Sequence, residues 1–432
     1  MSAGHVSVIG AGLAGSAAAL AAEAAGARVT LYEQRPATQT TIHDTALPGE
    51  LTGASDLGVE DLDRATGLLK AELRSTCPAI MECADEARIG EETLRVDRAR
   101  FATTVAECIE KADGIELVRE EIRTLPDGPV VVASGPGTWS PLARAIHRAA
   151  DTPFHFSFIG RPPLVAAESM DLSSAAWEEP YPGAEPALFL PLTAEEAEEL
   201  TRRLSAADDS EPPGFDDEMV LAEESVPVER LAADPQDGLR RVLQGPRGPE
   251  TTIEPPALCL TPDDAGRTAY HLDGLVTALP SEDQRNALSA VNALAEVQIL
   301  RPGCVQRTPW LAGREATLAS LQLRRVGRVL LAGALTGAWG YAEAMALGAV
   351  AGIGATRLSS GAEPLPPPAE SLTGALCRAL SELMPHADGR MLQANFGMIP
   401  EHSHDRGLEK PERREQQQER ALKAIENYAG AD

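Results

Sequence analysis

Three glycines near the N-terminus have a spacing that could bring backbone close to a phosphate group. Gly10 permits a tight turn after an apolar strand, Gly12 lets the backbone approach a pyrophosphate, and Gly15 lets a helix pack closely on the strand. Leu13 and Ala14 would begin that helix, whose free N–H groups would face the phosphates. The glycine pattern therefore predicts a dinucleotide-binding turn.

A carboxylate follows this turn at the distance that ribose recognition requires. Glu33 lies 18 residues after Gly15, at the end of a second strand, where it could accept both hydroxyls of an adenosine ribose. An acidic residue here favours free hydroxyls over a 2′-phosphate. We include the adjacent Gln34 and Arg35 in the predicted cofactor site. A glycine turn in another α/β protein is the alternative, but it does not account for the order of strand, turn, helix, strand and carboxylate.

The hydrophobic pattern predicts a parallel sheet around the turn. Residues 6–9 and 28–32 have the pattern of strands that flank an alanine-rich helix ending near residue 25. A helix at 99–111 leads into a further strand at 114–122, and we predict that Ile122 presents its backbone to the adenine ring.

Two further strands lead into small-residue turns that we assign to the same cofactor. The first covers residues 129–133 and the last covers residues 328–333, which a small-residue helix at 344–357 follows. The N-terminal dipole of that helix would face the flavin ring of FAD and stabilise its anionic reduced form. The predicted cofactor residues in these turns are Ser134, Gly135, Pro136, Gly333, Gly340, Tyr341 and Ala342.

Strands that lead into predicted cofactor-binding turns occur in both the N-terminal and the C-terminal part of the chain. We therefore predict a discontinuous FAD-binding domain. The predicted fold class is α/β, with a Rossmann-like, GR2-type FAD-binding domain at residues 1–151 and 303–432 and an inserted α+β domain at residues 152–302. Proline and paired acidic residues are frequent in the insert, where we expect mostly antiparallel strands and a few helices. Residues 364–368 would form a hinge before terminal helices.

The net charge limits the macromolecular partners. The chain has 65 acidic and 38 basic residues and a formal net charge of −27. Affinity for nucleic acid arises largely from cations that displace counterions from phosphates, so this excess argues against tRNA binding. An acidic proteome in the source organism is an alternative explanation for the charge. We expect small-molecule cofactors as partners, and the oligomeric state stays open.

The cysteines lack the spacing of a metal site or of a disulfide framework. We therefore predict no metal site and interpret the cysteines as small buried hydrophobic residues. No run of 18 apolar residues occurs, so we also expect a cytoplasmic protein without a membrane span. The six cysteines are Cys77, Cys83, Cys108, Cys259, Cys304 and Cys377.

Several longer motifs make the chain resemble the folate- and FAD-dependent tRNA (uracil-5-)-methyltransferase family, which is related to the GidA flavoproteins. The resemblance implies that members reduce FAD with NAD(P)H and transfer the methylene carbon of methylenetetrahydrofolate to C5 of a tRNA uracil. It therefore implies FAD as the cofactor, with NAD(P)H and a tetrahydrofolate as further candidate ligands. The matching segments include VIGAGLAGS at 8–16, YEQRP at 32–36, LLAGALTGAWGYAEA at 330–344 and QANFGMIPE at 393–401.

Two thiols that this family chemistry implies are missing. One thiolate would add to C6 of the uracil, and the other would help to remove the C5 proton. In segments that resemble ELVCSNSLR and GCMPVE, this chain has Gly53 and Ser225 in place of cysteine, so its catalytic residues stay unassigned. A segment that resembles MHRNTF keeps Arg307 but lacks the histidine, and we predict Arg307 and Glu343 as substrate-binding residues.

Three functions follow as hypotheses. The main one is an FAD-binding flavoprotein that has lost tRNA methylation and retains flavin redox chemistry with NAD(P)H or a folate. The second is an active methylenetetrahydrofolate-dependent uracil-5-methyltransferase acting on tRNA or rRNA. The third is a non-enzymatic redox or structural protein that contains FAD. Trp310 and Trp339 would either line the flavin pocket or fill the core.

Overall fold

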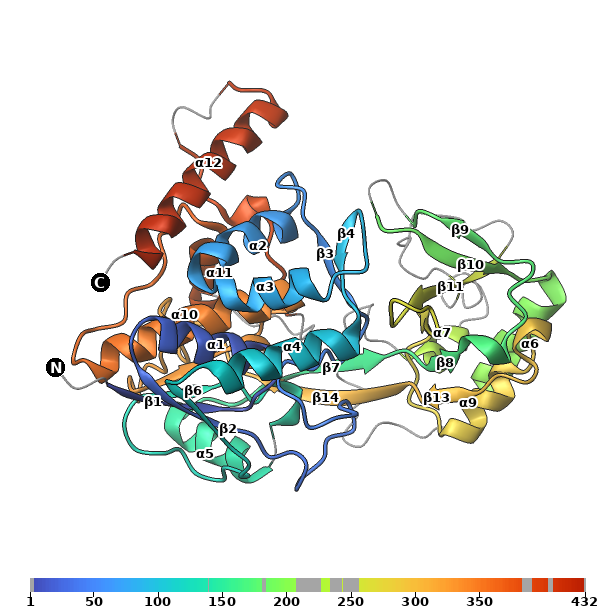
Figure 1. Cartoon of the computed structure of the whole chain (residues 1–432), viewed down its shortest axis with the longest axis horizontal. Helices are drawn as coiled ribbons and strands as arrows, with labels where there is room; N and C mark the ends of the chain where they lie inside the picture. The colour runs from blue at the N-terminus through green and yellow to red at the C-terminus, as the bar shows by residue number, and fades with distance from the viewer. Residues whose placement is uncertain are drawn as a thin grey trace.

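The protein has two lobes, and both ends of the chain lie in the larger one (Figure 1). The structure is a computed structural model that describes residues 4–138, 140–180, 184–206, 227–233, 243, 256–382, 391–402 and 407–430. The larger lobe contains a parallel sheet and most of the helices, and the smaller lobe contains an antiparallel sheet. The predicted dinucleotide-binding turn lies in the larger lobe.

A five-stranded parallel sheet forms the centre of the larger lobe. Its strand order is β15-β6-β1-β2-β5, so the last strand in the chain lies beside a strand from the first part. The middle strands are buried because helices cover them, and this explains their continuous apolar runs. The strands are β1 (His5–Ile9), β2 (Arg28–Tyr32), β5 (Ile115–Val118), β6 (Val130–Val132) and β15 (Val329–Leu331).

Two helices of small residues pack closely together in this lobe. Helix α1 (Leu13–Ala24) contacts α10 (Tyr341–Ser359) more extensively than any other pair of elements in the described part of the chain. A Cβ atom at Gly348 or Gly352 of α10 would overlap the backbone of α1. The many alanines and glycines therefore serve the close approach of two backbones rather than an amphipathic surface.

Helices α2, α3 and α4 cover the same side of the lobe as α1, beside a short two-stranded antiparallel sheet, and α5 lies at the opposite side of the parallel sheet (Figure 1). The Asp97 carboxylate caps α4 by accepting a hydrogen bond from the N–H group of Arg100 at 2.9 Å. These elements are β3 (Asp56–Val59), β4 (Thr93–Arg95), α2 (Ala65–Thr76), α3 (Pro78–Glu86), α4 (Arg98–Lys111) and α5 (Ser140–Ala150).

The smaller lobe contains a six-stranded sheet of order β13-β8-β12-β11-β10-β9 with antiparallel pairing throughout. Its strands lie in the chain between β6 and β15, and a two-stranded ribbon of β7 (His155–Arg161) and β14 (Cys304–Trp310) connects the lobes. The other elements are β8 (Leu164–Ala166), β9 (Ala176–Glu178), β10 (Ala187–Pro191), β11 (Ala257–Pro262), β12 (Ala269–Asp273), β13 (Ile299–Arg301), α6 (Ala194–Ala206), α7 (Val228–Ala232) and α9 (Ser281–Leu288).

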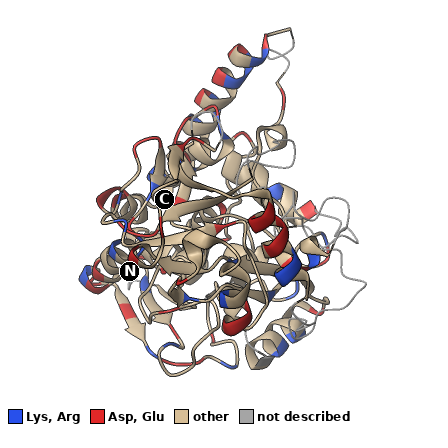
Figure 2. Ribbon diagram, turned by 90° about the vertical axis from the view of Figure 1, so that its right-hand side faces the viewer, with Lys and Arg blue, Asp and Glu red and all other residues tan. Residues whose placement is uncertain are grey.

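Two C-terminal helices pack on the larger lobe. Helix α11 (Leu372–Glu382) begins at the buried carboxylate of Glu72, which accepts hydrogen bonds from the N–H groups of Leu372 at 2.6 Å and Thr373 at 2.8 Å. Helix α12 (Lys410–Ala429) packs partly on α2 and extends beyond the body of the lobe (Figure 2). Within the described residues, we find no helix with the length and apolar character needed to cross a bilayer.

The predicted fold class is confirmed, with small differences in the ends of elements. Strand β5 ends at Val118 rather than near Ile122, because its partner β2 ends at Tyr32 and the last ladder bond runs from the N–H group of Glu33 to Val118. Helix α10 begins at Tyr341, three residues earlier than predicted, because Gly340 has the positive φ of +123° that starts the turn there.

Candidate functional site

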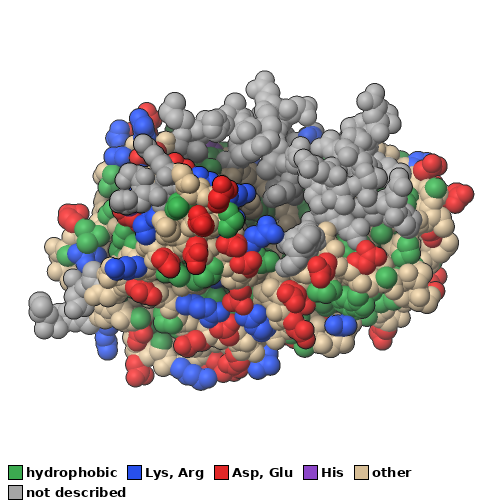
Figure 3. Space-filling view, turned by 90° about the horizontal axis from the view of Figure 1, so that it is seen from above, with side chains coloured by type: hydrophobic (Ala, Val, Ile, Leu, Met, Phe, Trp, Pro, Cys, Tyr) green, Lys and Arg blue, Asp and Glu red, His purple; other side chains and the backbone are tan. Residues whose placement is uncertain are grey.

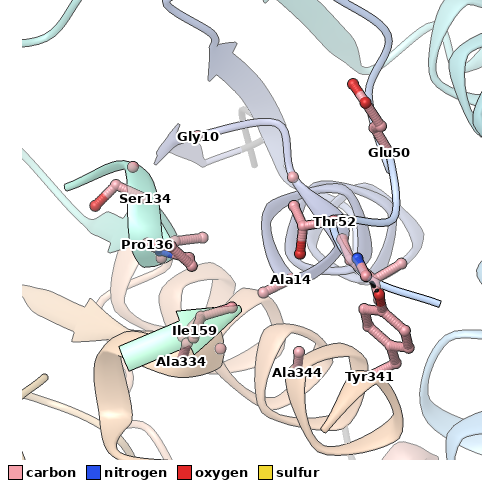
Figure 4. A pocket seen from close by; sticks show the side chains of 18 of the residues that line it. Gly10, Ala14, Glu50, Thr52, Ser134, Pro136, Ile159, Ala334, Tyr341 and Ala344 are labelled. Carbon is pink, nitrogen blue, oxygen red and sulfur yellow. Dashed lines mark hydrogen bonds between the residues drawn. The ribbon is translucent and has the colours of Figure 1, made fainter. Parts of the chain in front are cut away.

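A large cavity opens at the carboxyl ends of the parallel strands, where dinucleotide ligands bind in open α/β sheets. Its volume is about 520 Å³, and strand ends on both sides of β1 contribute to its lining. Figure 4 shows the first glycine turn, the turn after β6 and the start of α10 facing this space. The lining residues just after the four strand ends are Gly10, Glu33, Ala133 with Ser134, and Ala332 with Gly333.

The three glycines of the first turn occupy different environments. Gly10 has a φ of +96°, and a Cβ atom there would lie 2.8 Å from the carbonyl oxygen of Ala133. A Cβ atom at Gly15 would overlap the carbonyl oxygen of Gly10, so this glycine serves helix packing and does not line the cavity. A Cβ atom at Gly12 would meet no atom within 4 Å. The N-terminus of α1 therefore faces open space that a phosphate could fill.

The predicted ribose carboxylate belongs to a buried ion-pair network. Arg35 donates to Glu33 through Nε at 2.9 Å and Nη2 at 3.1 Å, and to Glu50 through Nη1 at 3.0 Å. Glu33 also accepts from the N–H group of Ala11 at 3.0 Å. Burial raises the pKa of Glu33, but the hydrogen bonds and charge of Arg35 outweigh burial and hold the pKa below its usual value. Glu33 is therefore ionised, and one guanidinium group holds the side chains of Glu33 and Glu50 in place.

Gln306 on β14 connects two loops beside the cavity. Its amide oxygen accepts from the hydroxyl of Thr41 at 2.6 Å, and its amide nitrogen donates to the carbonyl oxygen of Pro136. Thr40 and Pro136 line the cavity, so the return strand from the smaller lobe positions two parts of its wall. This residue occupies the place of the histidine in the MHRNTF-like segment.

The position that the resemblance assigns to a thiol lies in the cavity wall without a side chain. The N–H group of Gly53 donates to the phenol oxygen of Tyr341 at 2.7 Å, which ties the loop after Glu50 to the start of α10 (Figure 4). A Cβ atom at Gly53 would lie 3.0 Å from that oxygen. Burial raises the pKa of Tyr341, so its hydroxyl stays protonated at neutral pH. Ser225 lies outside the described residues.

Two other titratable groups face the cavity. Glu343 is buried, and its carboxyl accepts from the N–H group of Ala394 at 3.1 Å. Burial raises its pKa, which favours the protonated carboxyl more than usual. His43 bonds the hydroxyl of Thr40 through Nδ1 at 2.6 Å, and burial together with the charge of Arg35 lowers its pKa to about 3. His43 is therefore neutral at physiological pH.

The structure brings most of the predicted site residues together. Arg307 is an exception: it does not line the cavity, and its guanidinium group stacks over Phe156 at 3.5 Å from the ring centroid. Trp339 lines the cavity, whereas Trp310 is buried and donates to the hydroxyl of Ser157 at 3.1 Å. Gly53, where the resemblance implies a thiol, also lines the cavity. The predicted site residues that line it are Gly10, Gly12, Leu13, Ala14, Glu33, Gln34, Arg35, Ile122, Ser134, Gly135, Pro136, Gly333, Gly340, Tyr341, Ala342 and Glu343.

The sequence reasoning did not assign several wall residues to the site. Thr40, His43 and Glu50 match the resembling family in the printed sequence, and Gln393 belongs to its QANFG motif, so these matches were a usable signal. Thr66 and Ile159 carry no such signal, because only the packing of α2 and of the β7–β14 ribbon brings them to the cavity.

The cysteines differ from their predicted role in two cases. Cys77, Cys83, Cys259 and Cys377 are buried, but Cys108 and Cys304 are partly exposed. None of the six lines the cavity, and all six lie in the part of the chain that the structure describes. No group of metal-binding side chains of suitable geometry occurs among the described residues.

The cavity lining is acidic. Arg35 is the sole Lys or Arg among the described lining residues, and six carboxylates share the wall with it. On the outer face shown in Figure 3, basic and acidic side chains are interspersed, and the basic ones do not gather into one patch. The acidic lining residues are Glu33, Glu50, Asp56, Glu120, Glu121 and Glu343.

Comparisons with known proteins agree with this geometry. The family model "Glucose inhibited division protein A" matches residues 5–363. Two crystal forms of Aquifex aeolicus GidA align with 99% of the chain at TM-scores of 0.69 and 0.70 and cover 73% and 75% of the GidA chains. Their identities of 18% and 17% support the shared fold alone.

Sequence relatives cover the chain at higher identity. A protein named methylenetetrahydrofolate–tRNA-(uracil-5-)-methyltransferase TrmFO from Moorella thermoacetica is 36% identical over 92% of both chains. Proteins of the same name from Natranaerobius thermophilus and Deinococcus radiodurans are 34% and 36% identical over 98% and 93% of this chain, and over 99% and 87% of their own lengths. This chain therefore belongs to the GidA-related family that includes the TrmFO proteins.

Proposed function

We propose that this chain is an FAD-binding flavoprotein that has lost the methylation of uracil in tRNA and that retains redox chemistry with NAD(P)H or a folate. The observation that carries the proposal is Gly53, a residue without a side chain at the cavity position where the resemblance implies a thiol. Three features of the described residues support it: the fit of the cavity to FAD, the absence of a lining thiol, and the acidic lining.

The cavity residues fit FAD. The open space at Gly12 and the free N–H groups of Leu13 and Ala14 suit a pyrophosphate at the N-terminus of α1. Glu33 suits the adenosine ribose, and the start of α10 at Tyr341 suits the flavin end. When bound, FAD would supply two-electron transfer. The protein residues would orient it and exclude water from its reactive face.

The chemistry of uracil methylation demands a nucleophile that the cavity lining lacks. A thiolate activates the pyrimidine by adding to C6, and a serine hydroxyl without an adjacent base is a far weaker nucleophile at neutral pH. In the described structure, no cysteine lines the cavity, and the Tyr341 hydroxyl occupies the space beside Gly53.

The charge of the site also favours a small ligand over RNA. The lining carries six carboxylates and one guanidinium group, and the chain has a formal net charge of −27. An RNA phosphate backbone approaching such a cavity would gain few cation contacts and would meet like charges.

The second candidate is an active uracil-5-methyltransferase that uses another nucleophile. The comparisons favour it, because relatives of that name are 34–36% identical over nearly the whole chain. The two candidates make opposite predictions for a single assay.

The test is an incubation of the purified protein with NADPH, methylenetetrahydrofolate and tRNA that lacks 5-methyluridine. We expect NADPH to bleach the flavin absorbance, and no 5-methyluridine to form. The Moorella thermoacetica relative, assayed in parallel, is the positive control. Formation of 5-methyluridine at a rate comparable with that of the control would show that methylation has been retained, and a protein that takes up no FAD would contradict the proposal entirely.

Two variants examine the role of position 53. Gly53→Cys restores the thiol, but its Cβ atom would lie 3.0 Å from the Tyr341 hydroxyl, so the phenol must move. We expect Gly53→Cys to lower the thermal midpoint. The double variant Gly53→Cys with Tyr341→Phe should recover part of this decrease, with an interaction free energy between the two substitutions of about 0.5–3 kcal/mol. Additive effects of the two substitutions would show that the hydroxyl does not restrict this position.

A further inference from the structure

Arginines from both lobes meet at one carboxylate beside the cavity. Asp44, which follows the cavity residue His43, accepts hydrogen bonds from Nη1 of Arg301 at 2.8 Å and from Nη1 of Arg161 at 3.1 Å. It also accepts from Nη2 of Arg98 at 3.2 Å. Arg301 ends β13 in the smaller lobe, Arg161 ends the ribbon strand β7, and Arg98 begins α4 in the larger lobe. The Asp44 carboxylate therefore joins the two lobes at the edge of the cavity.

The charge of Asp44 balances cations that are buried. Arg161 and Arg301 are each 5% exposed, and within the described residues both form their ion pairs with Asp44. Burial raises the pKa of Asp44, but the hydrogen bond and charge of Arg301, together with the charges of Arg161 and Arg98, outweigh burial and hold the pKa below its usual value. The carboxylate is therefore ionised, and its loss would leave buried guanidinium groups without the anion that they face.

The loop that carries Asp44 also holds the ion pairs of the predicted ribose carboxylate. The N–H group of Asp44 donates to Oε1 of Glu50 at 2.7 Å. Thr45 donates to Oε2 of Glu50 through its N–H group at 3.0 Å and through its hydroxyl at 2.8 Å. The carbonyl oxygen of Thr45 accepts from Nη1 of Arg35 at 3.0 Å, and Arg35 in turn holds Glu33. Residues 44 and 45 therefore fix both partners of the ion pair between Arg35 and Glu50.

We propose that Asp44 is a positioning residue for the cofactor and that it makes the affinity of the cavity for FAD depend on the attachment of the smaller lobe. The inference rests on the proposed function, because it requires Glu33 to receive the adenosine ribose. Release of the Asp44 carboxylate would free the loop, so Glu50 would lose the N–H groups that orient it. Arg35 would then hold Glu33 less firmly. A carboxylate that must be ordered during binding lowers the affinity for its ligand.

A second contact between the lobes provides a matched control. Glu185 of the smaller lobe accepts hydrogen bonds through Oε2 from the N–H groups of Glu91 and Glu92, both at 2.8 Å. It also accepts from the N–H group of Thr93, the first residue of β4, at 3.2 Å. None of these four residues lines the cavity. Loss of the Glu185 carboxylate therefore weakens the attachment of the smaller lobe without removing a hydrogen bond from the loop that carries Asp44.

Titration of the full-length apoprotein with FAD, followed by flavin fluorescence, tests the effect on affinity. Asp44→Asn removes the charge and keeps the side-chain volume, and we expect the Kd for FAD to rise about 5- to 150-fold, the usual range of coupling between sites. Arg301→Met, which removes the contact from the smaller lobe, should raise the Kd as well. Glu185→Gln should leave the Kd within about twofold of the wild-type value, because it acts at an independent contact.

Amide hydrogen exchange of the apoprotein examines the same loop without a ligand. In Asp44→Asn, the N–H groups of Arg35, residue 44 and Thr45, which donate to the two glutamates, should exchange at least about tenfold faster than in the wild type. In Glu185→Gln, their exchange should not change.

The outcomes separate this inference from the proposed function. Equal Kd values for FAD in the wild type and Asp44→Asn, or an equal rise in Asp44→Asn and Glu185→Gln, would overturn the positioning role while FAD binding stands. Faster exchange throughout the chain of Asp44→Asn, rather than in this loop, would indicate a general loss of stability and would overturn the role as well. A wild-type apoprotein that takes up no FAD would contradict the proposed function and, with it, the role of Asp44.

Discussion

Replacing Gly12 with alanine should abolish cofactor binding while leaving the fold intact. The added Cβ atom meets no protein atom within 4 Å, and the residue has a φ of −68°, which any residue adopts. Gly12 is the N-cap of α1, where alanine is less favourable than glycine, but the lower entropy of the unfolded chain offsets part of this cost. We expect the free energy of unfolding of the apoprotein to change by less than about 1 kcal/mol.

The effect on FAD binding should be far larger. The new methyl group would occupy the space into which a pyrophosphate must fit, so the phosphate would lose its hydrogen bonds to the N–H groups of Leu13 and Ala14. Each hydrogen bond to a charged group contributes about 1.5–3 kcal/mol, and two of them correspond to a Kd that is about 100- to 10,000-fold higher. Titration of the apoprotein with FAD, followed by flavin fluorescence quenching, measures this change.

Gly15→Ala is the matched control for this prediction. Its Cβ atom would overlap the carbonyl oxygen of Gly10, so we expect a loss of unfolding free energy of about 1–3 kcal/mol or more, measured by urea denaturation of the apoprotein. A Gly12→Ala variant that binds FAD as tightly as the wild type would refute the assignment of this turn to the pyrophosphate. A Gly12→Ala apoprotein as unstable as the Gly15→Ala variant would refute the structural argument.

Three further predictions concern buried charges. Arg35→Met should lower the unfolding free energy by about 3–5 kcal/mol in urea denaturation, because Glu33 and Glu50 would both lose their buried cation. Burial raises the pKa of Glu72 to about 7. The contribution of Glu72 to the free energy of unfolding is therefore complete below about pH 4.5 and is lost as the pH rises towards 7. In urea titrations, the difference in unfolding free energy between the wild type and Glu72→Gln should shrink over this pH range. Burial lowers the pKa of His43 to about 3. The contribution of His43 to the stability of the fold is therefore present above about pH 6.5 and is lost as the pH falls. Below about pH 6.5, the thermal midpoint of His43→Gln should fall less steeply than that of the wild type.

The local motifs were predictable from the sequence because each depends on a short stretch of chain. Gly10 needs the positive φ that glycine readily adopts, Gly15 needs the absence of a Cβ atom for helix packing, and the apolar runs of β1 and β6 match strands buried on both faces. The order of these elements restricts the fold to a parallel sheet with its ligand at the carboxyl ends of the strands.

The partners of charged residues were not predictable in the same way. Arg35 was a candidate contact for the cofactor, but the structure shows it between two buried glutamates, of which Glu50 comes from a loop 15 residues later. Arg307 was a candidate for substrate binding, but it stacks on Phe156 across the β7–β14 ribbon. Substrate binding by Arg307 and Glu343, like the domain boundaries at residues 152–302, stays a prediction.

The sequence by itself determined the dinucleotide-binding turn and the parallel sheet around it, because composition and spacing along the chain are sufficient for both. The resemblance to the family's segments identified the two positions where a thiol is missing. Only the tertiary structure decided that the Tyr341 hydroxyl occupies the space beside Gly53. Gly53 and Tyr341 are separated by 288 residues, and such contacts arise from the packing of whole helices rather than from any local pattern.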